Sequence, residues 1–188
     1  MRHFYIVLNA IPVISKREVD HGQLSDEVAE LCSCIRAALF LSHDIRRDVR
    51  VHLILLGERK DVVISGESVR YLSPDERSLC MLLIKFSERK TRKPWRGVCV
   101  KEFASLREIF PSDGVLIVPN DERDELQQVE NLKEVMLIVP LNPLGKLERE
   151  LDNIKKLHVK VCGKLDPSSL ITVINNRIDI TEEQQCSL

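Results

Sequence analysis

The sequence predicts an α/β fold in which a mostly parallel β-sheet is flanked by helices. Short apolar segments, typical of buried strands, recur along the chain and are separated by segments with an apolar residue every three or four positions. Strands that alternate with helices of this length usually form a parallel sheet with helices on both faces. In addition, 188 residues of which 44% are apolar suit one domain with a sizeable core. We therefore expect a single domain over residues 1–188.

In the first half, the strands are short apolar runs and the helices have one apolar face. A helix over residues 25–42 is expected to begin at Ser25, a good N-cap, and to bury the side chains of its apolar face. The next helix, over residues 73–86, is expected to have Ser73 as its cap and Pro74 at its first position. The expected strands are residues 4–8, 49–56 and 62–64, and residues 15–23 are expected to form a loop.

The second half repeats the same alternation with shorter elements. The pattern shows no tandem repeat, low-complexity tract or linker, which again indicates one domain. The expected strands are residues 97–100, 115–118, 135–139 and 159–161, and the expected helices are residues 103–110, 144–157 and 168–177.

Charge and cysteine content limit the classes of function. The formal net charge is −1, so any binding site for nucleic acid must be a local basic patch. The six cysteines form no C-x-x-C pair, and no signal peptide or long apolar span occurs. Disulfides or a zinc site are the alternatives, but reduced, buried thiols are the better interpretation. We expect a cytoplasmic protein without a membrane segment or a metal.

Common catalytic signatures are missing from the sequence. No G-x-G-x-x-G follows the first strand, and neither a phosphate loop nor H-E-x-x-H occurs. His43 and Asp44 are adjacent, but neighbours on a helix do not face each other. A turn at the end of a helix explains this pair better than a catalytic dyad does.

Residues 39–49 form a doubly basic connection between a helix and a strand. Arg46 and Arg47 lie there, in the kind of segment that often carries a binding site. The alternative is a helix end at which the arginines satisfy the last carbonyl groups.

A second basic stretch runs over residues 85–96 and includes Arg92, Lys93 and Trp95. Several cations beside an aromatic ring suit a surface that grips phosphates and stacks a base. A solvated helix end followed by a charged loop is the alternative.

Several longer motifs together resemble one family, the archaeal tRNA pseudouridine N1-methyltransferases of the SPOUT class. The longest is FLSHDIRRDV, preceded by a two-cysteine segment, and the blocks occur in the order and near the spacing of that family. The matching blocks are LCSC (31–34), ALFLSHDIRRDV (38–49), YLSPDER (71–77), WRGV (95–98) and LITVINNRID (170–179).

The resemblance implies a C-terminal trefoil knot, a homodimer, and S-adenosylmethionine bound within the knot. It further implies transfer of a methyl group to N1 of pseudouridine 54 in the T-loop of tRNA. Asp44 and Asp75 are carboxylates in matching motifs and are the candidates for removing the N1 proton. The cofactor-binding residues implied are Val118, Pro119, Val139, Pro140, Gly163, Lys164, Leu165 and Leu170. The implied RNA-binding residues are Arg46, Arg47 and Arg77, to which the basic stretch adds Arg92, Lys93 and Trp95.

The sequence also departs from the family pattern. An early L-P-G-x-x-G-R-x-D block has lost its arginine and aspartate in residues 23–29. A strand that usually ends in V-L-G-D-H-I-G here ends at Val139 and Pro140, and proline has no backbone donor. Three hypotheses remain open: an active tRNA methyltransferase, a SPOUT homodimer that only binds RNA or protein, and a methyltransferase for another RNA such as a ribosomal one.

Overall fold

The structure is a computed structural model of residues 1–188. The residues it describes are 1–87, 95–110, 115–120, 122–126, 135–140, 155–161, 163 and 165–186.

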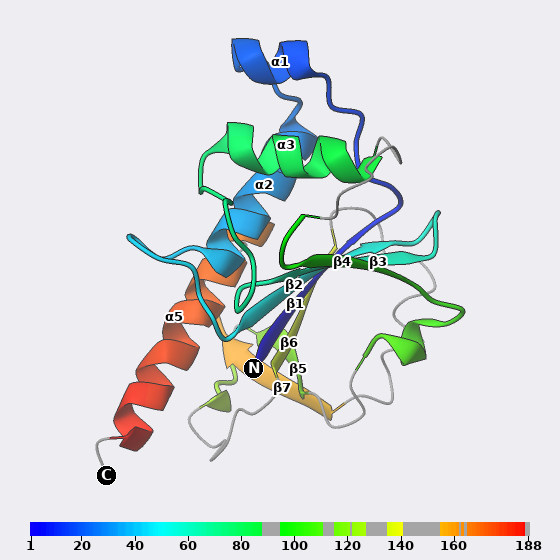
Figure 1. Ribbon diagram of the computed structural model, residues 1–188. Coiled ribbons are helices and arrows are strands. Elements are labelled where there is room, and N and C mark those ends of the chain that lie inside the picture. Colours follow the sequence, from blue (N-terminus) through cyan, green and yellow to red (C-terminus); the bar gives the residue numbers. More distant parts are fainter. Residues whose placement is uncertain are drawn as a thin grey trace.

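A seven-stranded sheet with the order β4-β3-β2-β1-β6-β5-β7 forms the centre of the described part of the chain (Figure 1). Strand β1 lies between β2 and β6 and is parallel to both, and β5 is parallel to β6 and β7. Strands β3 and β4 join the other edge in antiparallel orientation, so the sheet is mixed. The strands are β1 (Arg2–Leu8), β2 (Val49–Leu55), β3 (Lys60–Ser65), β4 (Val98–Glu102), β5 (Val115–Asn120), β6 (Val135–Pro140) and β7 (Lys155–Lys160).

The three longest described helices lie together on one face of the sheet (Figure 1). Helix α2 contacts α5, α3 and strand β2, so it is the centre of this layer. Ser25 is its N-cap, as expected, and its hydroxyl oxygen accepts a hydrogen bond from the Val28 amide. The helices are α1 (Lys16–His21), α2 (Asp26–Leu39), α3 (Glu76–Ser87) and α5 (Pro167–Cys186), and a 3₁₀ helix covers Leu106–Glu108.

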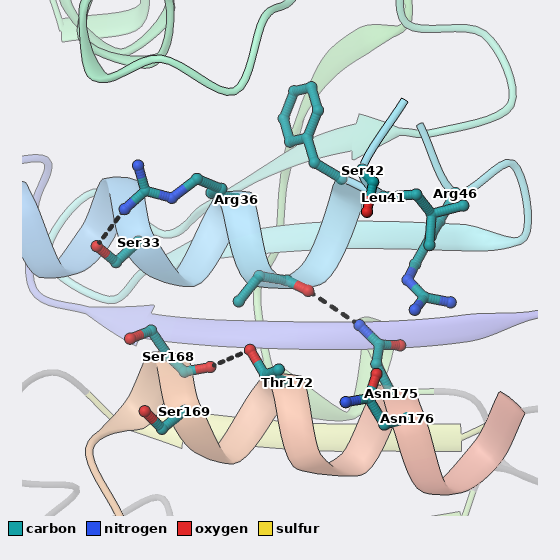
Figure 2. A pocket seen from close by; sticks show the side chains of 12 residues that line it. Ser33, Arg36, Leu41, Ser42, Arg46, Ser168, Ser169, Thr172, Asn175 and Asn176 are labelled. Carbon is teal, nitrogen blue, oxygen red and sulfur yellow. Dashed lines mark hydrogen bonds between the residues drawn. The ribbon is translucent and has the colours of Figure 1, made fainter. Parts of the chain in front are cut away.

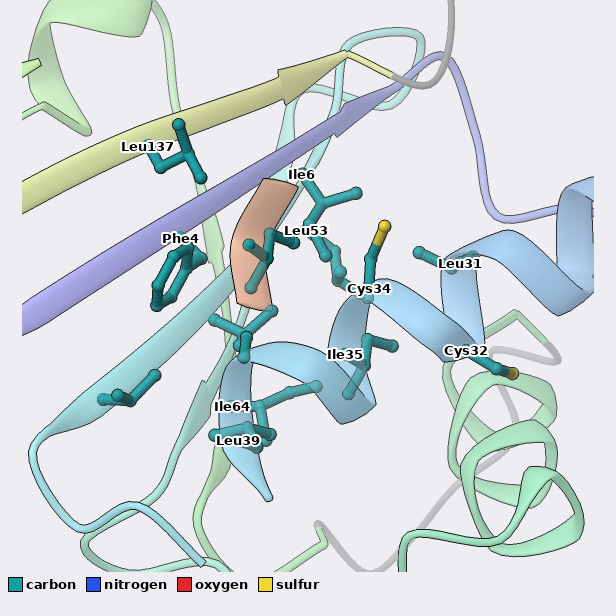
Figure 3. Packing of buried hydrophobic residues seen from close by; sticks show 14 of the residues in the cluster. Phe4, Ile6, Leu31, Cys32, Cys34, Ile35, Leu39, Leu53, Ile64 and Leu137 are labelled. Atoms are coloured by element: carbon teal, nitrogen blue, oxygen red, sulfur yellow. The ribbon is translucent and has the colours of Figure 1, made fainter. Parts of the chain in front are cut away.

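Alternation of side chains along the central strands divides the core into two clusters. On the helix face, Phe4 and Leu53 of the sheet belong to one buried cluster with Leu31 and Ile35 of α2 (Figure 3). On the opposite face, a smaller cluster gathers Tyr5 of the central strand with residues of the 3₁₀ segment. Both faces of β1 are therefore covered, and all seven of its residues are buried.

Four expectations about secondary structure need correction. Residues 16–21 form helix α1 instead of a loop, since a capping box of Ser15 and Glu18 starts a helix that buries no side chain. Residues 103–110 contain only the 3₁₀ turn. Residues 155–157 were expected to end a helix, but they pair with β5 and belong to β7, while residues 144–154 lie outside the described residues. Helix α5 continues to Cys186, nine residues past the expected end at residue 177.

A fifth correction concerns helix α3, which begins at Glu76, two residues after the expected first position at Pro74. Its cap is Asp75, whose carboxylate accepts the amide of Ser78, and not Ser73. Ser73 donates its hydroxyl to the same carboxylate, so Ser73 and Pro74 form a turn before the helix. The segment does start a helix, as predicted, but the capping residue is Asp75, two residues after Ser73.

Cysteine burial agrees with the sequence for three of the four described thiols. Cys32, Cys34 and Cys80 are free and buried, and burial raises the pKa of each thiol. Cys99 is exposed on β4, which the expectation of buried thiols did not foresee. Within the described ranges, no helix has the length and apolarity needed to span a membrane. The same residues contain no group of three metal-ligating side chains.

Candidate functional site

Two buried arginines and one carboxylate fasten the C-terminal helix to the first half of the chain. Asp179 of α5 receives two hydrogen bonds from Arg46, at 2.9 and 2.7 Å, and forms an ion pair with Arg2 at 2.6 Å. Burial acts to raise the pKa of Asp179, but the hydrogen bonds from Arg46 and Arg2 bring the pKa below its ordinary value. Arg46, expected to grip RNA, is therefore already engaged by an intramolecular partner.

Asn175 makes a second connection between α5 and the rest of the fold. Its amide donates to the carbonyls of Ala37 and Ala38 at 3.0 and 3.4 Å, and its side-chain oxygen accepts from Arg2 at 3.2 Å. Both the amide nitrogen and the oxygen of this side chain are therefore hydrogen-bonded within the protein, and only 1% of the residue is exposed. The last turn of α2 and the middle of α5 are thereby held at a fixed separation.

A groove of about 420 Å³ lies beside these contacts, between α2 and α5 (Figure 2). Polar side chains from both helices point into it, with Arg36 and Arg46 as its cations. Phe40 and Leu41 supply an apolar end, and Leu41 is 47% exposed. The other polar residues that line it are Ser33, Ser42, Ser168, Ser169, Thr172, Asn175 and Asn176.

The loop between α2 and β2 is closed by Asp44. Its carboxylate accepts the Ile45 amide at 2.7 Å and a guanidinium hydrogen of Arg47 at 3.0 Å. The hydrogen bond from Ile45 is the largest cause that lowers the pKa of Asp44, and the charge and hydrogen bond of Arg47 lower it further. Arg47 also donates to the Gly66 carbonyl at 3.0 Å, and about half of its side chain stays exposed.

The second catalytic candidate, Asp75, is likewise an acceptor for the backbone. The Ser73 hydroxyl and then the Ser78 amide lower its pKa, which favours the ionised form. Arg77, on the first turn of α3, pairs with Asp20 of α1 and keeps 65% of its side chain exposed. Asp44 and Asp75 thus have turn and cap roles, and nothing in their hydrogen bonding distinguishes either as a base.

Trp95 lies against the loop that connects β3 to α3. Its indole N–H donates to the Arg70 carbonyl at 3.0 Å, and the Lys85 amine lies 5.3 Å from the ring centroid. One face of the ring is therefore occupied by a cation of the same chain. Arg92 and Lys93, expected to bind RNA with Trp95, lie outside the described residues.

The cofactor residues implied by the resemblance gather near one edge of the sheet. Because β5, β6 and β7 are parallel neighbours, their carboxyl ends meet at the same edge, and Val118, Pro119, Val139 and Pro140 lie there. Gly163 follows β7 with φ 76°, and a Cβ at that position would meet no atom within 4 Å. Leu165 and Leu170 are half-buried beyond it, and Lys164 lies outside the described residues.

Within the described residues, strands β5 and β6 pair over a short stretch only. The paired residues are Val115 with Val135 and Leu116 with Met136, at the amino ends of the strands, whereas β5 pairs with β7 along its whole length. Backbone groups near the carboxyl ends of β5 and β6 are consequently suited to contact a ligand.

Comparison with known proteins now identifies the family. Residues 1–183 match the family described as "Putative SAM-dependent RNA methyltransferase". The chain belongs to this methyltransferase family.

Two curated relatives and one solved structure illustrate the similarity. The tRNA (pseudouridine(54)-N(1))-methyltransferase of Methanococcoides burtonii is 35% identical over 164 residues, 79% of this chain and 81% of the relative. The enzyme of that name from Methanocella arvoryzae is 56% identical over 95 residues, 47% of this chain and 48% of the relative. The crystal structure of Archaeoglobus fulgidus Nep1 bound to S-adenosylhomocysteine has a TM-score of 0.63 at 12% identity, and covers 96% of this chain and 98% of that one.

For a member of this methyltransferase family, the arrangement has two separate parts. Strand ends at the carboxyl edge of β5, β6 and β7 carry residues expected at the cofactor, whereas the described arginines expected at the RNA lie in the loop before β2 and on the first turn of α3. No role was assigned from the sequence to Arg2, Asn175 or Asp179, which join α5 to strand β1, the end of α2 and the loop before β2. Asn175 and Asp179 lie in the matching block 170–179, which was the sequence signal for them.

Proposed function

We propose that this chain is an S-adenosylmethionine-dependent RNA methyltransferase that methylates N1 of pseudouridine 54 in the T-loop of tRNA. The observation that carries this proposal is the 35% identity over four fifths of a relative named for that activity. The family match over residues 1–183 and the fold shared with Nep1 support the same reaction class.

The carboxyl edge of the sheet suits S-adenosylmethionine. Gly163 leaves open space where a side chain would project, and the half-buried Val118 and Leu165 offer apolar surface for an adenine ring. Bound there, the cofactor supplies a methyl group on a sulfonium. The chain's part is to hold the cofactor in line with the base nitrogen and to exclude water, which supplies most of the acceleration in a transfer of this kind.

Exposed cations in the loop before β2 and on the first turn of α3 support RNA binding. Arg47 and Arg77 are each held by a carboxylate of the chain, yet 48% and 65% of their side chains remain exposed. Because the net charge is only −1, these local cations are needed to attract phosphates. Arg92 and Lys93 extend this part of the proposal along the sequence from Trp95.

The proposal includes the knot, the homodimer and the cytoplasmic location expected for this class of enzyme. The groove between α2 and α5 supports a dimer, because it offers the exposed Leu41 and a row of hydroxyl and amide groups to a second copy. The parallel β5, β6 and β7, followed by the turn at Gly163, support the knot.

One observation favours the non-catalytic alternative, an RNA- or protein-binding homodimer of the same fold. Pro140 ends β6 where the family pattern has glycine, so the strand end lacks one backbone donor and carries a ring. A third candidate, methylation of ribosomal RNA, needs the same cofactor pocket and differs only in its substrate.

Calorimetric titration with S-adenosylmethionine tests the proposal first. Micromolar affinity is expected for the wild type. Leu165→Arg should abolish binding by filling the site, whereas Ile180→Arg, which places the same charge on an exposed position of α5, should leave the affinity unchanged.

Methylation assays then separate the candidates. Transfer of a labelled methyl group to a T-arm hairpin with pseudouridine at the target position is expected, and transfer only to ribosomal RNA would select the third candidate. Absence of cofactor binding at millimolar concentration would contradict both enzymatic candidates and leave the binding module.

A further inference from the structure

Tyr71 has an unusual combination of exposure and backbone conformation. It lies in the loop between β3 and α3, 91% of it is exposed, and its φ is 60°. Among the described residues, Arg59 is the other non-glycine residue with positive φ, and it lies in the turn between β2 and β3. A bulky side chain rarely adopts this conformation, and such strain persists where function requires the side chain.

The loop holds the Tyr71 ring in solvent by anchoring the residues near it. Val69 and Leu72 are buried in the core cluster on the helix face. The Val69 amide donates to the Ser65 carbonyl at 2.8 Å, and the indole of Trp95 donates to the carbonyl of Arg70, the residue before Tyr71. The ring is thus presented on a fixed backbone and not on a loose loop.

Two arginines lie in and beside the loop that carries Tyr71. Arg47 is bonded to Gly66 at the start of the same loop, and the Arg70 guanidinium lies along the loop through its hydrogen bond to the Val69 carbonyl. Lys85 covers the Trp95 ring, which makes Trp95 a support for the loop and leaves Tyr71 as its accessible aromatic. An exposed ring among cations is the arrangement with which proteins bind single-stranded nucleic acid.

We propose that Tyr71 stacks on an unpaired base of the RNA substrate and so positions the RNA on this loop. This inference rests on the proposed function, since it names a contact of the same RNA. An RNA is favoured over a protein partner because, among the described residues with large exposed apolar side chains, Tyr71 is the aromatic one, and Arg70 and Arg47 lie in and beside its loop.

Three substitutions separate stacking from a structural role. Tyr71→Phe keeps the ring and should keep the affinity for a T-arm hairpin. Tyr71→Leu keeps apolar bulk without a π face and should weaken binding about tenfold. Tyr71→Gly removes the ring and suits φ 60°, so it should also weaken binding about tenfold while the urea unfolding midpoint stays close to that of the wild type. Val13→Ala, at another almost fully exposed apolar side chain, is the matched control and should leave binding unchanged.

A fluorescent base gives a direct readout of stacking. Hairpins that carry 2-aminopurine at one loop position at a time are titrated with each variant, and the affinity for S-adenosylmethionine is measured in parallel. We expect one position whose fluorescence is quenched by the wild type and by Tyr71→Phe, and not by Tyr71→Leu. Cofactor affinity should be equal in all of them.

The outcomes distinguish this inference from the proposed function. If the wild type binds and methylates the hairpin and Tyr71→Leu binds it equally well, stacking is overturned and the enzyme assignment stands. If Tyr71→Leu instead changes the mass of the protein in solution, Tyr71 is a contact between copies and the inference is wrong. If the wild type neither binds nor methylates RNA, both proposals fail.

Discussion

The guanidinium of Arg46 lies in a two-pronged contact with the carboxylate of Asp179, with Nη1–Oδ1 at 2.9 Å and Nη2–Oδ2 at 2.7 Å. The pair joins the loop before β2 to the C-terminal helix over 133 positions of sequence. Arg2 shares the same carboxylate and also pairs with Asp48 and Glu182, so Asp179 is the acid that contacts both buried arginines. Removal of this acid is therefore costlier than removal of an ordinary surface partner.

Asp179→Asn should lower the free energy of unfolding by about 2 kcal/mol, because it leaves Arg2 and Arg46 buried with less compensating charge. The value is below that of a fully buried pair, since 32% of the Asp179 side chain is exposed and solvent screens it. Urea denaturation measures the change. Glu182→Gln removes a partner of Arg2 that is 48% exposed, and should cost less than about 1 kcal/mol. Equal effects of the two substitutions would contradict the role assigned to Asp179.

Arg47→Gln should change RNA binding, whereas Arg46→Gln should change the stability of the fold. Arg47 is half-exposed, so its loss should weaken RNA binding a few-fold and make binding less dependent on salt, with little change in stability. Arg46 is 8% exposed and paired, so its loss should destabilise the fold. Filter binding at several salt concentrations, together with urea denaturation, measures both effects. RNA binding that depends on Arg46 alone, in a folded variant, would reverse this assignment.

Gly97 and Gly22 both have positive φ, but substitution by alanine should lower the free energy of unfolding much more at Gly97 than at Gly22. A Cβ on Gly97 would lie 2.2 Å from the backbone nitrogen of Val69, so Gly97→Ala must displace the loop that holds Tyr71 and should cost about 3 kcal/mol or more. At Gly22 no atom lies within 4 Å of such a Cβ, and Gly22→Ala should cost only about 1 kcal/mol for the left-handed backbone. Thermal unfolding compares the two. Similar melting temperatures for Gly97→Ala and Gly22→Ala would mean that the loop can move at little cost in free energy.

Acid should destabilise the protein through the buried pair of His3 and His52. Their Nδ1 and Nε2 atoms are 2.9 Å apart, and His52 Nδ1 lies 3.0 Å from Asp61 Oδ2. Burial and then His52 lower the pKa of His3 to about 4, so the folded state favours neutral His3. This contribution is complete above the ordinary value near 6.5 and is lost as the pH falls toward 4, by about 3 kcal/mol in total.

His3→Gln tests this pH dependence, since it removes the titrating ring and keeps a donor for His52. Urea midpoints at pH 7 and pH 5 should differ less in His3→Gln than in the wild type. His43→Gln, at an exposed histidine, is the control and should keep the wild-type difference. An unchanged difference in His3→Gln would place the acid sensitivity elsewhere.

Thiol labelling should separate Cys99 from the buried cysteines. In a background with Cys162→Ser and Cys186→Ser, one thiol should react rapidly with Ellman's reagent under native conditions, because Cys99 is exposed. Cys32, Cys34 and Cys80 should react only on unfolding, since burial raises the pKa of each. Rapid labelling of more than one thiol would show that the α2–α3 interface opens.

Sequence patterns determined most of the strands, because a buried strand needs apolar side chains at short range and these are visible in the chain itself. Residues 4–8, 49–56 and 135–139 were located to within two residues at each end. The helix cap at Ser25 was also local and was predicted correctly. Local periodicity predicted a helix for Lys155–Leu157 and was wrong, since their extended form comes from pairing with β5.

The candidate site divides in the same way. Motif resemblance pointed to the loops before β2 and α3 and to the strand ends expected at the cofactor, because these are contiguous in sequence. The tertiary structure alone decided that Arg46 is buried against Asp179 and that Tyr71 faces solvent. Charge pairing, burial and loop conformation depend on residues far apart in the chain, and no local pattern encodes that distance.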